Sequence, residues 1–360
     1  MGRSFRFLLA LLLPLSLVWG QNDTSPQLKQ RPAAPSSTPP GGTERQITLD
    51  VQVTDKSGAP VRGLQKQDFT LLDDKQPANI LSFQAVDSGA ADPPRELVLV
   101  VDAVNASLVA VAYERSQLKK FLLQNGGKLE QPASLVIFSD AGTKIQQEPS
   151  RDGNALAAEY DQYETGLRTI KRSQGFYGAA ERFDMSIKTM TRLMSYEETR
   201  PGRKLIIWFS PGWPLLSGPN VQISGNSARQ LFNSIVEFST GLRESRITLY
   251  SIDPLGLADA GGGRIWDYMQ FVKGASDPRP VLPGNLALQV LVVQSGGRVF
   301  NSSNNLTAAI ASCASDADSF YVLTFDAPRA DHPDEYHTLG VTVDKPGVTA
   351  RTRTGYYAQP

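Results

Sequence analysis

The sequence predicts an α/β fold in which a mostly parallel sheet, covered by helices on both faces, is inserted into a small β-sandwich. The α/β part is predicted by four apolar strands that alternate with amphipathic segments, three of these strands ending in Asp. The sandwich is predicted by segments of alternating apolar and polar residues on both sides of this region. Because neither terminal set of strands can bury its apolar face alone, we expect the two sets to pair with each other.

The central strand of the predicted sheet is the run ELVLVVD, which ends at Asp102. The run is bounded by Asp92-Pro93-Pro94 upstream and by Asn105-Ala106-Ser107 downstream. A short apolar run between such turn formers is typical of a strand that is buried on both faces. Asp102 would then lie at the carboxyl edge of the sheet, where open α/β folds place their ligand crevice.

The remaining elements follow from the same two periodicities. Strands of the sandwich are expected at 47–55, 69–72, 80–86, 319–326, 335–344 and 348–357. Further strands of the central sheet are expected at 133–140, 143–150, 205–212, 247–253 and 298–301. Helices are expected at 113–124, 154–163, 178–194, 228–243, 285–294 and 306–317. This alternation implies right-handed crossovers between parallel strands.

The first 43 residues differ in character from the rest of the chain. Residues 1–20 place Arg3 and Arg6 ahead of a short apolar run, which is typical of a secretory signal peptide. Residues 21–43 are rich in Pro, Ser, Thr and Gly, so we expect a disordered linker. We therefore predict an exported protein, periplasmic or extracellular, with no membrane span in the mature chain. The sandwich domain would comprise 44–90 and 319–358, and the α/β domain 95–318.

Composition excludes several classes of function. Lys and Arg together number 36, as do Asp and Glu, and this balance argues against nucleic-acid binding. The single cysteine, Cys313, is expected to be a buried helix residue. Both histidines, His332 and His337, fall in the predicted sandwich, without the spacing of a zinc site. We therefore predict that the protein is not an enzyme, with an unrecognised hydrolase, using a carboxylate pair, as the alternative from another class.

The layout resembles a von Willebrand factor type A domain, specifically the related exported group of bacterial, acidobacterial-type proteins. The resemblance covers roughly residues 44–358. It is carried by the motifs VTDKSGAPVRGLQKQDFTLLDD, LVLVVDAVNAS, LVIFSD, KLIIWFSPG, ITLYSID, YVLTFD and VTARTRTGYYA. It implies a type A, Rossmann-like sheet and a role in protein–protein interaction or adhesion.

The resemblance also implies a metal-ion-dependent adhesion site, which this sequence matches only in part. In the family, Asp-x-Ser-x-Ser, a Thr and a second Asp supply oxygens to Mg²⁺. Here Asp102 matches the first position, but Val104 and Ala106 replace the two serines, and Pro211 stands in place of the second Asp. We therefore expect a degenerate site without a cofactor, in which Asp102 caps the turn that follows it.

The alternative is a rearranged site that binds Mg²⁺ or Ca²⁺. Its candidate ligands are Asp102, Asn105, Ser107 and Ser210.

The loop after the strand 205–212 contains the candidate partner-binding residues Trp213, Leu215 and Leu216. Apolar side chains at the edge of a sheet mark a contact surface if they are exposed. Alternatively, the loop packs under the segment 257–284. The function predicted from the sequence is thus an exported, non-catalytic module that binds a protein partner, and the alternative is a module whose adhesion depends on a divalent cation.

Overall fold

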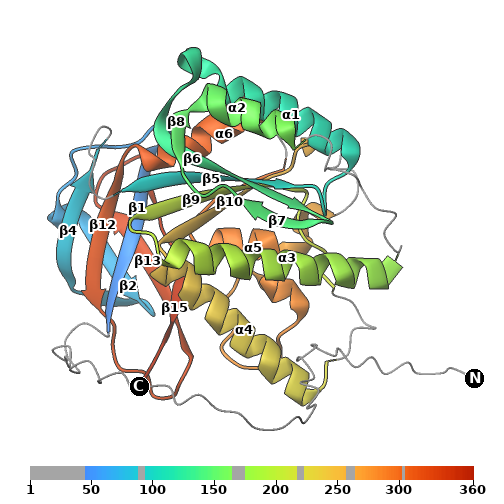
Figure 1. The fold of residues 1–360 in the computed structure, drawn as a ribbon. Helices are drawn as coiled ribbons and strands as arrows, with labels where there is room; N and C mark the ends of the chain where they lie inside the picture. The colour runs from blue at the N-terminus through green and yellow to red at the C-terminus, as the bar shows by residue number, and fades with distance from the viewer. Residues whose placement is uncertain (1–44, 88–93, 164–174, 217–222, 257–263, 302–304) are drawn as a thin grey trace, which may run out of the picture.

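The predicted fold class is confirmed by the computed structural model, which describes residues 45–87, 94–163, 175–216, 223–256, 264–301 and 305–360 (Figure 1). The predicted signal peptide, the predicted linker and the glycines at 261–263 lie outside the described residues.

The central sheet has seven strands in the order β11-β10-β9-β5-β6-β7, with β8 paired to β6. The five strands from β11 to β6 in this order are parallel, whereas β7 and β8 are antiparallel to β6. The strands are β5 (Arg95–Asp102), β6 (Lys128–Ser139), β7 (Gly142–Ile145), β8 (Ser150–Asp152), β9 (Arg203–Phe209), β10 (Ile247–Ile252) and β11 (Val299–Phe300). Every residue of β5, β9 and β10 is buried, as their apolar sequences predict.

Helices cover both faces of this sheet (Figure 1). One face is covered by α1 (Leu108–Leu122), α2 (Gly153–Gln162) and α6 (Leu306–Ala314). The other is covered by α3 (Gly175–Glu198), α4 (Gly225–Glu244) and α5 (Leu288–Gln294). Short 3₁₀ turns are η1 (Lys66–Asp68), η2 (Gln124–Gly127), η6 (Arg264–Phe271), η7 (Pro283–Leu286) and η8 (Ser315–Ala317).

Several boundaries differ from the prediction, among them the start of the first helix and the predicted strand 143–150. Helix α1 begins five residues before the predicted 113, because the Ser107 hydroxyl accepts a hydrogen bond from the Ala110 amide at 3.2 Å and caps the helix. The predicted strand 143–150 is two strands, β7 and β8, separated by Gln146–Pro149.

The sandwich consists of two four-stranded sheets, β14-β1-β12-β4 and β15-β13-β2-β3, that share one apolar core. The strands are β1 (Gln46–Asp55), β2 (Phe69–Asp73), β3 (Gln76–Ala78), β4 (Ile80–Val86), β12 (Phe320–Asp326), β13 (Glu335–Val343), β14 (Val348–Arg351) and β15 (Gly355–Ala358). Strands from the two ends of the folded chain alternate in the first sheet. In the second sheet the C-terminal pair β15-β13 lies beside the N-terminal pair β2-β3, so in both sheets each set supplies partners that the other lacks.

The sandwich sits against the amino edge of the central sheet, and charged side chains join the two parts (Figure 1). The carboxylate of Asp316 accepts hydrogen bonds from Tyr250 at 2.7 Å, Arg298 at 3.2 Å and Arg351 at 2.5 Å. Asp50 of β1 pairs with Arg246 at 2.5 Å. The carboxyl edge of the central sheet therefore faces away from the sandwich.

Candidate functional site

Asp102 lies at the carboxyl end of β5, at the point where the chain reverses its direction of winding across the sheet. Strand β6, which follows β5 through α1, pairs with one side of β5, and β9 pairs with the other. Helices α1 and α3 cover opposite faces here. This is the position at which doubly wound sheets bind ligands.

The Asp102 carboxylate is fully buried, and both of its oxygens accept hydrogen bonds. Oδ1 accepts from the amides of Val104 at 2.9 Å and Asn105 at 2.8 Å. Oδ2 accepts from Asn105 Nδ2 at 2.8 Å and from the indole Nε1 of Trp208 at 2.9 Å. Burial raises the pKa of Asp102, and the hydrogen bonds from Asn105, Trp208 and Ser210 oppose the rise. The carboxylate thus holds the β5–α1 turn.

The other candidate metal ligands lie nearby, but each is engaged by the protein. The Asn105 side chain also donates to Ser186 Oγ at 2.9 Å, which links this turn to α3. Ser107 caps α1, and the Ser210 hydroxyl accepts from the Gly212 amide at 3.2 Å.

The donors around Asp102 do not fit the cation that the resemblance implies. A Mg²⁺ or Ca²⁺ site needs several oxygens directed at one point. Here N–H groups point at the carboxylate instead, and the buried side chains of Val104 and Ala106 replace two hydroxyls. The Oδ1 atom of Asn105 has no hydrogen-bond partner, and one amide oxygen does not supply the missing ligands.

Trp213 is buried, so the expectation of an exposed side chain is wrong for this residue. Its side chain is 3% exposed, and its ring centroid lies 5.1 Å from that of Trp208 in an edge-to-face contact. It shares a core cluster with Ala275 and Val281, which belong to the segment 257–284. The alternative drawn from the sequence, in which the loop packs against this segment, therefore accounts for the burial of Trp213.

Leu215 and Leu216 are half-buried. Leu215 packs on the small cluster that contains Phe271.

The exposed apolar side chains of this edge lie on α1 and α3 instead. Leu108 and Val109, in the first turn of α1, are 56% and 70% exposed. Tyr177, in the first turn of α3, is 65% exposed. Helix α3, whose first turn contains Tyr177, extends beyond the end of the sheet (Figure 1). Sequence reasoning missed Leu108 and Val109 because it began the helix at residue 113.

Glu114 is buried like Asp102, but sequence reasoning did not identify it. It is fully buried on the inner face of α1, and neither oxygen has a hydrogen-bond partner. Burial, reinforced by the charge of Asp102, raises the pKa of Glu114 well above its usual range.

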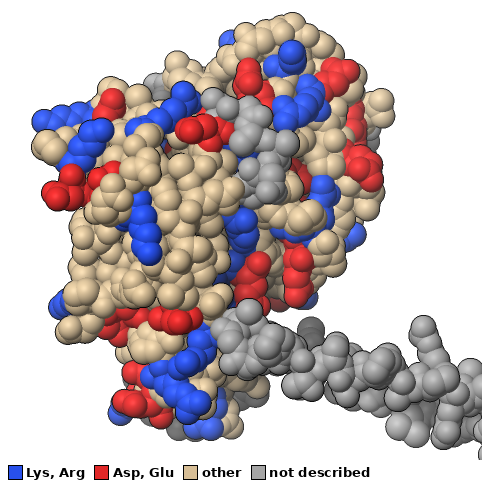
Figure 2. All heavy atoms as spheres, turned by 90° about the vertical axis from the view of Figure 1, so that its left-hand side faces the viewer, with Lys and Arg blue, Asp and Glu red and all other residues tan. Residues whose placement is uncertain are grey.

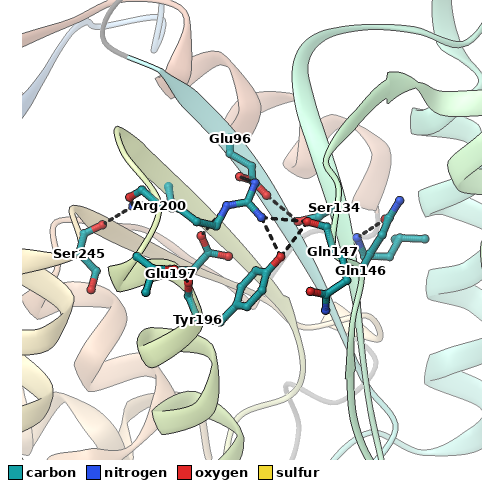
Figure 3. A network of polar contacts seen from close by, with 11 residues as sticks. Glu96, Ser134, Gln146, Gln147, Tyr196, Glu197, Arg200 and Ser245 are labelled. Atoms are coloured by element: carbon teal, nitrogen blue, oxygen red, sulfur yellow. Dashed lines mark hydrogen bonds and ion pairs between the residues drawn. The ribbon is translucent and has the colours of Figure 1, made fainter. Parts of the chain in front are cut away.

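A network of polar contacts lies at the opposite, amino edge of the sheet (Figure 3). Arg200 donates to Glu96 at 2.8 Å and to the Tyr196 hydroxyl at 2.9 Å. Glu197 lies 3.8 Å from Arg200, but its carboxylate is buried and accepts no hydrogen bond. Burial, followed by the charge of Glu96, raises the pKa of Glu197 to about 7. Because the carboxylates of Glu96 and Glu197 are both buried, a substrate cannot reach this pair.

A third group, Asp73, Asp74 and His337, has ligand atoms within 4.8 Å of one another. His337 is 7% exposed and has Nδ1 at 2.9 Å from Asp73 Oδ1 and 3.4 Å from Asp74 Oδ2. Tyr356 donates to the other oxygen of Asp73 at 2.7 Å. These atoms are of the types that bind divalent cations. In this structure a hydrogen bond joins His337 to Asp73, and Asp74 accepts hydrogen bonds from Thr338.

The surface charges are mixed in sign. Figure 2 shows the sandwich end of the molecule, where Lys and Arg side chains alternate with Asp and Glu and with broad uncharged areas. On this face the described residues do not form the basic stripe that is typical of nucleic-acid-binding proteins. No helix within the described residues is both long enough and apolar enough to cross a membrane.

No protein-family model matches the sequence, and no curated protein matches it. Many solved structures are similar to parts of the chain, including the following three. An aerotolerance-related membrane protein from Bacteroides fragilis is 12% identical over 62% of this chain and 98% of its own, with a TM-score of 0.31. The PilB minor pilin from Streptococcus sanguinis is 13% identical over 62% of each chain, with a TM-score of 0.35. The SpRpn10 VWA domain is 12% identical over 44% of this chain and 74% of its own, with a TM-score of 0.24.

Proposed function

We propose that the protein is an exported, non-catalytic module that binds a protein partner at the carboxyl edge of its central sheet, without a metal ion. The observation that carries this proposal is the pair of exposed apolar side chains, Leu108 and Val109, in the first turn of α1. Neighbouring exposed apolar residues mark contact surfaces, and the first turn of a helix more often carries polar residues. The charged start and apolar core of residues 1–20 support export.

We propose binding without a metal ion because the Asp102 carboxylate is already hydrogen-bonded within the protein. Four N–H donors already satisfy its two oxygens, so a cation would have to break these bonds and lower the stability of the β5–α1 turn. The alternative function, adhesion that depends on a cation bound by Asp102, Asn105, Ser107 and Ser210, predicts instead that chelators abolish binding.

The test replaces Leu108 and Val109 together by Ser and compares the variant with Leu123→Ser. Leu123 is a matched control, because it is 45% exposed at the other end of α1. Each protein is immobilised through its C-terminus, exposed to an envelope and secreted extract of the cells that produce it, and the retained proteins are identified by mass spectrometry.

We expect the double variant to lose at least about tenfold of the retention of one specific protein, since a contact worth about 1.4 kcal/mol changes affinity tenfold. The Leu123 variant and the native protein in EDTA should retain it equally. Unchanged retention by the double variant would refute the surface. Loss in EDTA with recovery in Mg²⁺ would favour the cation-dependent alternative.

A further inference from the structure

A small polar cavity lies at the junction between the sandwich and the α/β part. Its volume is about 20 Å³. The sandwich contributes residues of β1 and of the segment after β14, and the α/β part contributes the end of α4, the start of β10 and the residue after α5. Its lining includes the charged residues Asp50, Arg243, Arg246 and Arg353 and the hydroxyl-bearing Thr248.

Arg353 has an unusual environment for a charged residue. Its side chain is 8% exposed, and within the described residues the structure gives its guanidinium no hydrogen bond and no ion pair. Burial is the largest cause that lowers the pKa of Arg353, and the nearby charge of Arg243 is the second. The pKa falls to about 10, so the group still carries its charge at neutral pH. A buried charge without a partner is strongly unfavourable, and buried arginines are almost always paired.

The rest of the cavity supplies only part of the missing negative charge. Among the described lining residues Asp50 is the only carboxylate; its charge opposes the fall in the pKa of Arg353, but it is shared with Arg246 at 2.5 Å and with Arg203 at 3.7 Å. The Nε atom of Arg246 is buried without a partner. Arg243 pairs outward with Glu244 at 2.8 Å. Three guanidinium groups therefore face one carboxylate, which leaves an excess of positive charge around a space lined by N–H and O–H donors.

We propose that this cavity binds a small monatomic anion of the chloride class, held by Arg353 and Arg246 and by the hydroxyl of Thr248. The size of the cavity selects this class, because about 10–15 Å³ suffices for one water-sized sphere, and a chloride ion is only slightly larger. A water molecule would fit, but it would leave the charge of Arg353 uncompensated.

The anion has a structural consequence. Asp50 and Arg353 belong to the sandwich, whereas Arg243 and Arg246 belong to the α/β part. A bound anion therefore fastens the two parts together, and binding to the folded state alone stabilises it by mass action.

The test compares the full mature chain in sodium chloride and in sodium gluconate at equal ionic strength. Gluconate is too large for the cavity and serves as the reference anion. In chloride well above its dissociation constant, we expect the Tm to rise by about 3–5 °C. The line width of ³⁵Cl in nuclear magnetic resonance should increase in the presence of the protein and return when bromide displaces the chloride.

Arg353→Met should abolish both effects and should be at least as stable as the native protein in gluconate, because an uncompensated buried charge is removed. Arg279→Met is the control of equal charge, since Arg279 is exposed and pairs only with Asp277, and it should keep the native response. A native Tm that is the same in both salts, or an Arg353 variant that responds to chloride as the native protein does, would refute the site.

Crystals grown in sodium bromide decide the matter if the Arg353 variant does not fold. Bromide scatters anomalously, and we expect its peak within hydrogen-bonding distance of the Arg353 guanidinium. Ordered bromide elsewhere on the surface, with none in the cavity, would show an adventitious ion only and would overturn the proposal.

Discussion

Buried carboxylates behave differently in this protein according to the donors around them. Asp102 is fully buried, yet four N–H groups satisfy its oxygens, so the carboxylate organises a turn. Glu197 is equally buried, but no donor reaches its carboxylate. Sequence alone reveals neither difference, because the donors to Asp102 include the indole of Trp208, which lies 106 residues further along the chain.

The raised pKa of Glu197 predicts a pH-dependent stability. Below about pH 4.5 the carboxyl is protonated in both the folded and the unfolded chain, and its burial is tolerated. As the pH rises toward 7, the unfolded chain releases the proton while the folded chain retains it, so the free energy of unfolding falls and then levels off above about pH 7. The contribution amounts to at most about 3 kcal/mol.

Urea denaturation at pH 4.5 and pH 7.5 measures this contribution. The native protein should lose stability relative to Glu197→Gln over this interval. Glu198→Gln, at the exposed neighbouring position, should follow the native protein. Parallel curves for the native protein and the Glu197 variant would show that this carboxyl titrates as it does in the unfolded chain.

At the scale of elements, the segment after β9 is held in place by close packing against α5. Gly212 has a φ of +108°, and a Cβ added there would lie 2.0 Å from the Nε2 atom of Gln289. Gln289 in turn donates to the carbonyl of Pro211 at 3.1 Å. This contact fixes the direction in which the chain leaves β9, and it therefore turns Trp213 into the core.

We predict that Gly212→Ala destabilises the protein by about 2–4 kcal/mol, because it combines an unfavourable backbone conformation with a clash. Gly142→Ala separates these two causes, since Gly142 has the same φ of +108° but nothing within 4 Å of the added Cβ. It should lose only about 1–2 kcal/mol. Urea denaturation gives the stabilities, and a red shift of tryptophan emission in the Gly212 variant alone would report exposure of Trp213. Equal losses for both variants would mean that the clash has no effect.

The strands of the central sheet could be predicted because each is a short apolar run buried on both faces, a property that its own residues specify. The start of α1 could not, because Asn105-Ala106-Ser107 has the composition of a turn and serves here as a turn that caps a helix. Burial of Trp213 depends on α5 and on the segment before it, and the isolation of Arg353 depends on four separate elements. These contacts join segments that are distant in the chain, so the local periodicity of the sequence does not predict them.

At the scale of the whole molecule, the two parts are joined by buried charges as well as by the chain. Asp316 receives donors from β10, from the residue before β11 and from β14, so a single carboxylate holds residues of both parts. Removing one member of a buried ionic network leaves the others unpaired, which destabilises a protein by about 3–5 kcal/mol.

We therefore predict that Asp316→Asn lowers the stability of both parts together. Tryptophan fluorescence reports the α/β part, since Trp208, Trp213 and Trp266 all follow β5 and precede β12, whereas far-ultraviolet circular dichroism reports both parts. The two urea transitions should coincide and shift together to lower denaturant. The exposed Asp326→Asn serves as the control. Two separated transitions in the native protein would show that the parts unfold independently.

The insertion of the α/β part between β4 and β12 also determines how the molecule carries mechanical load. Both ends of the folded chain leave from the sandwich, β1 at one end and β15 at the other. A pull exerted by a partner at the far edge of the central sheet therefore reaches the sandwich through two covalent crossings instead of one. The tension is divided between them, and the charged side chains at the junction resist shear between the two parts.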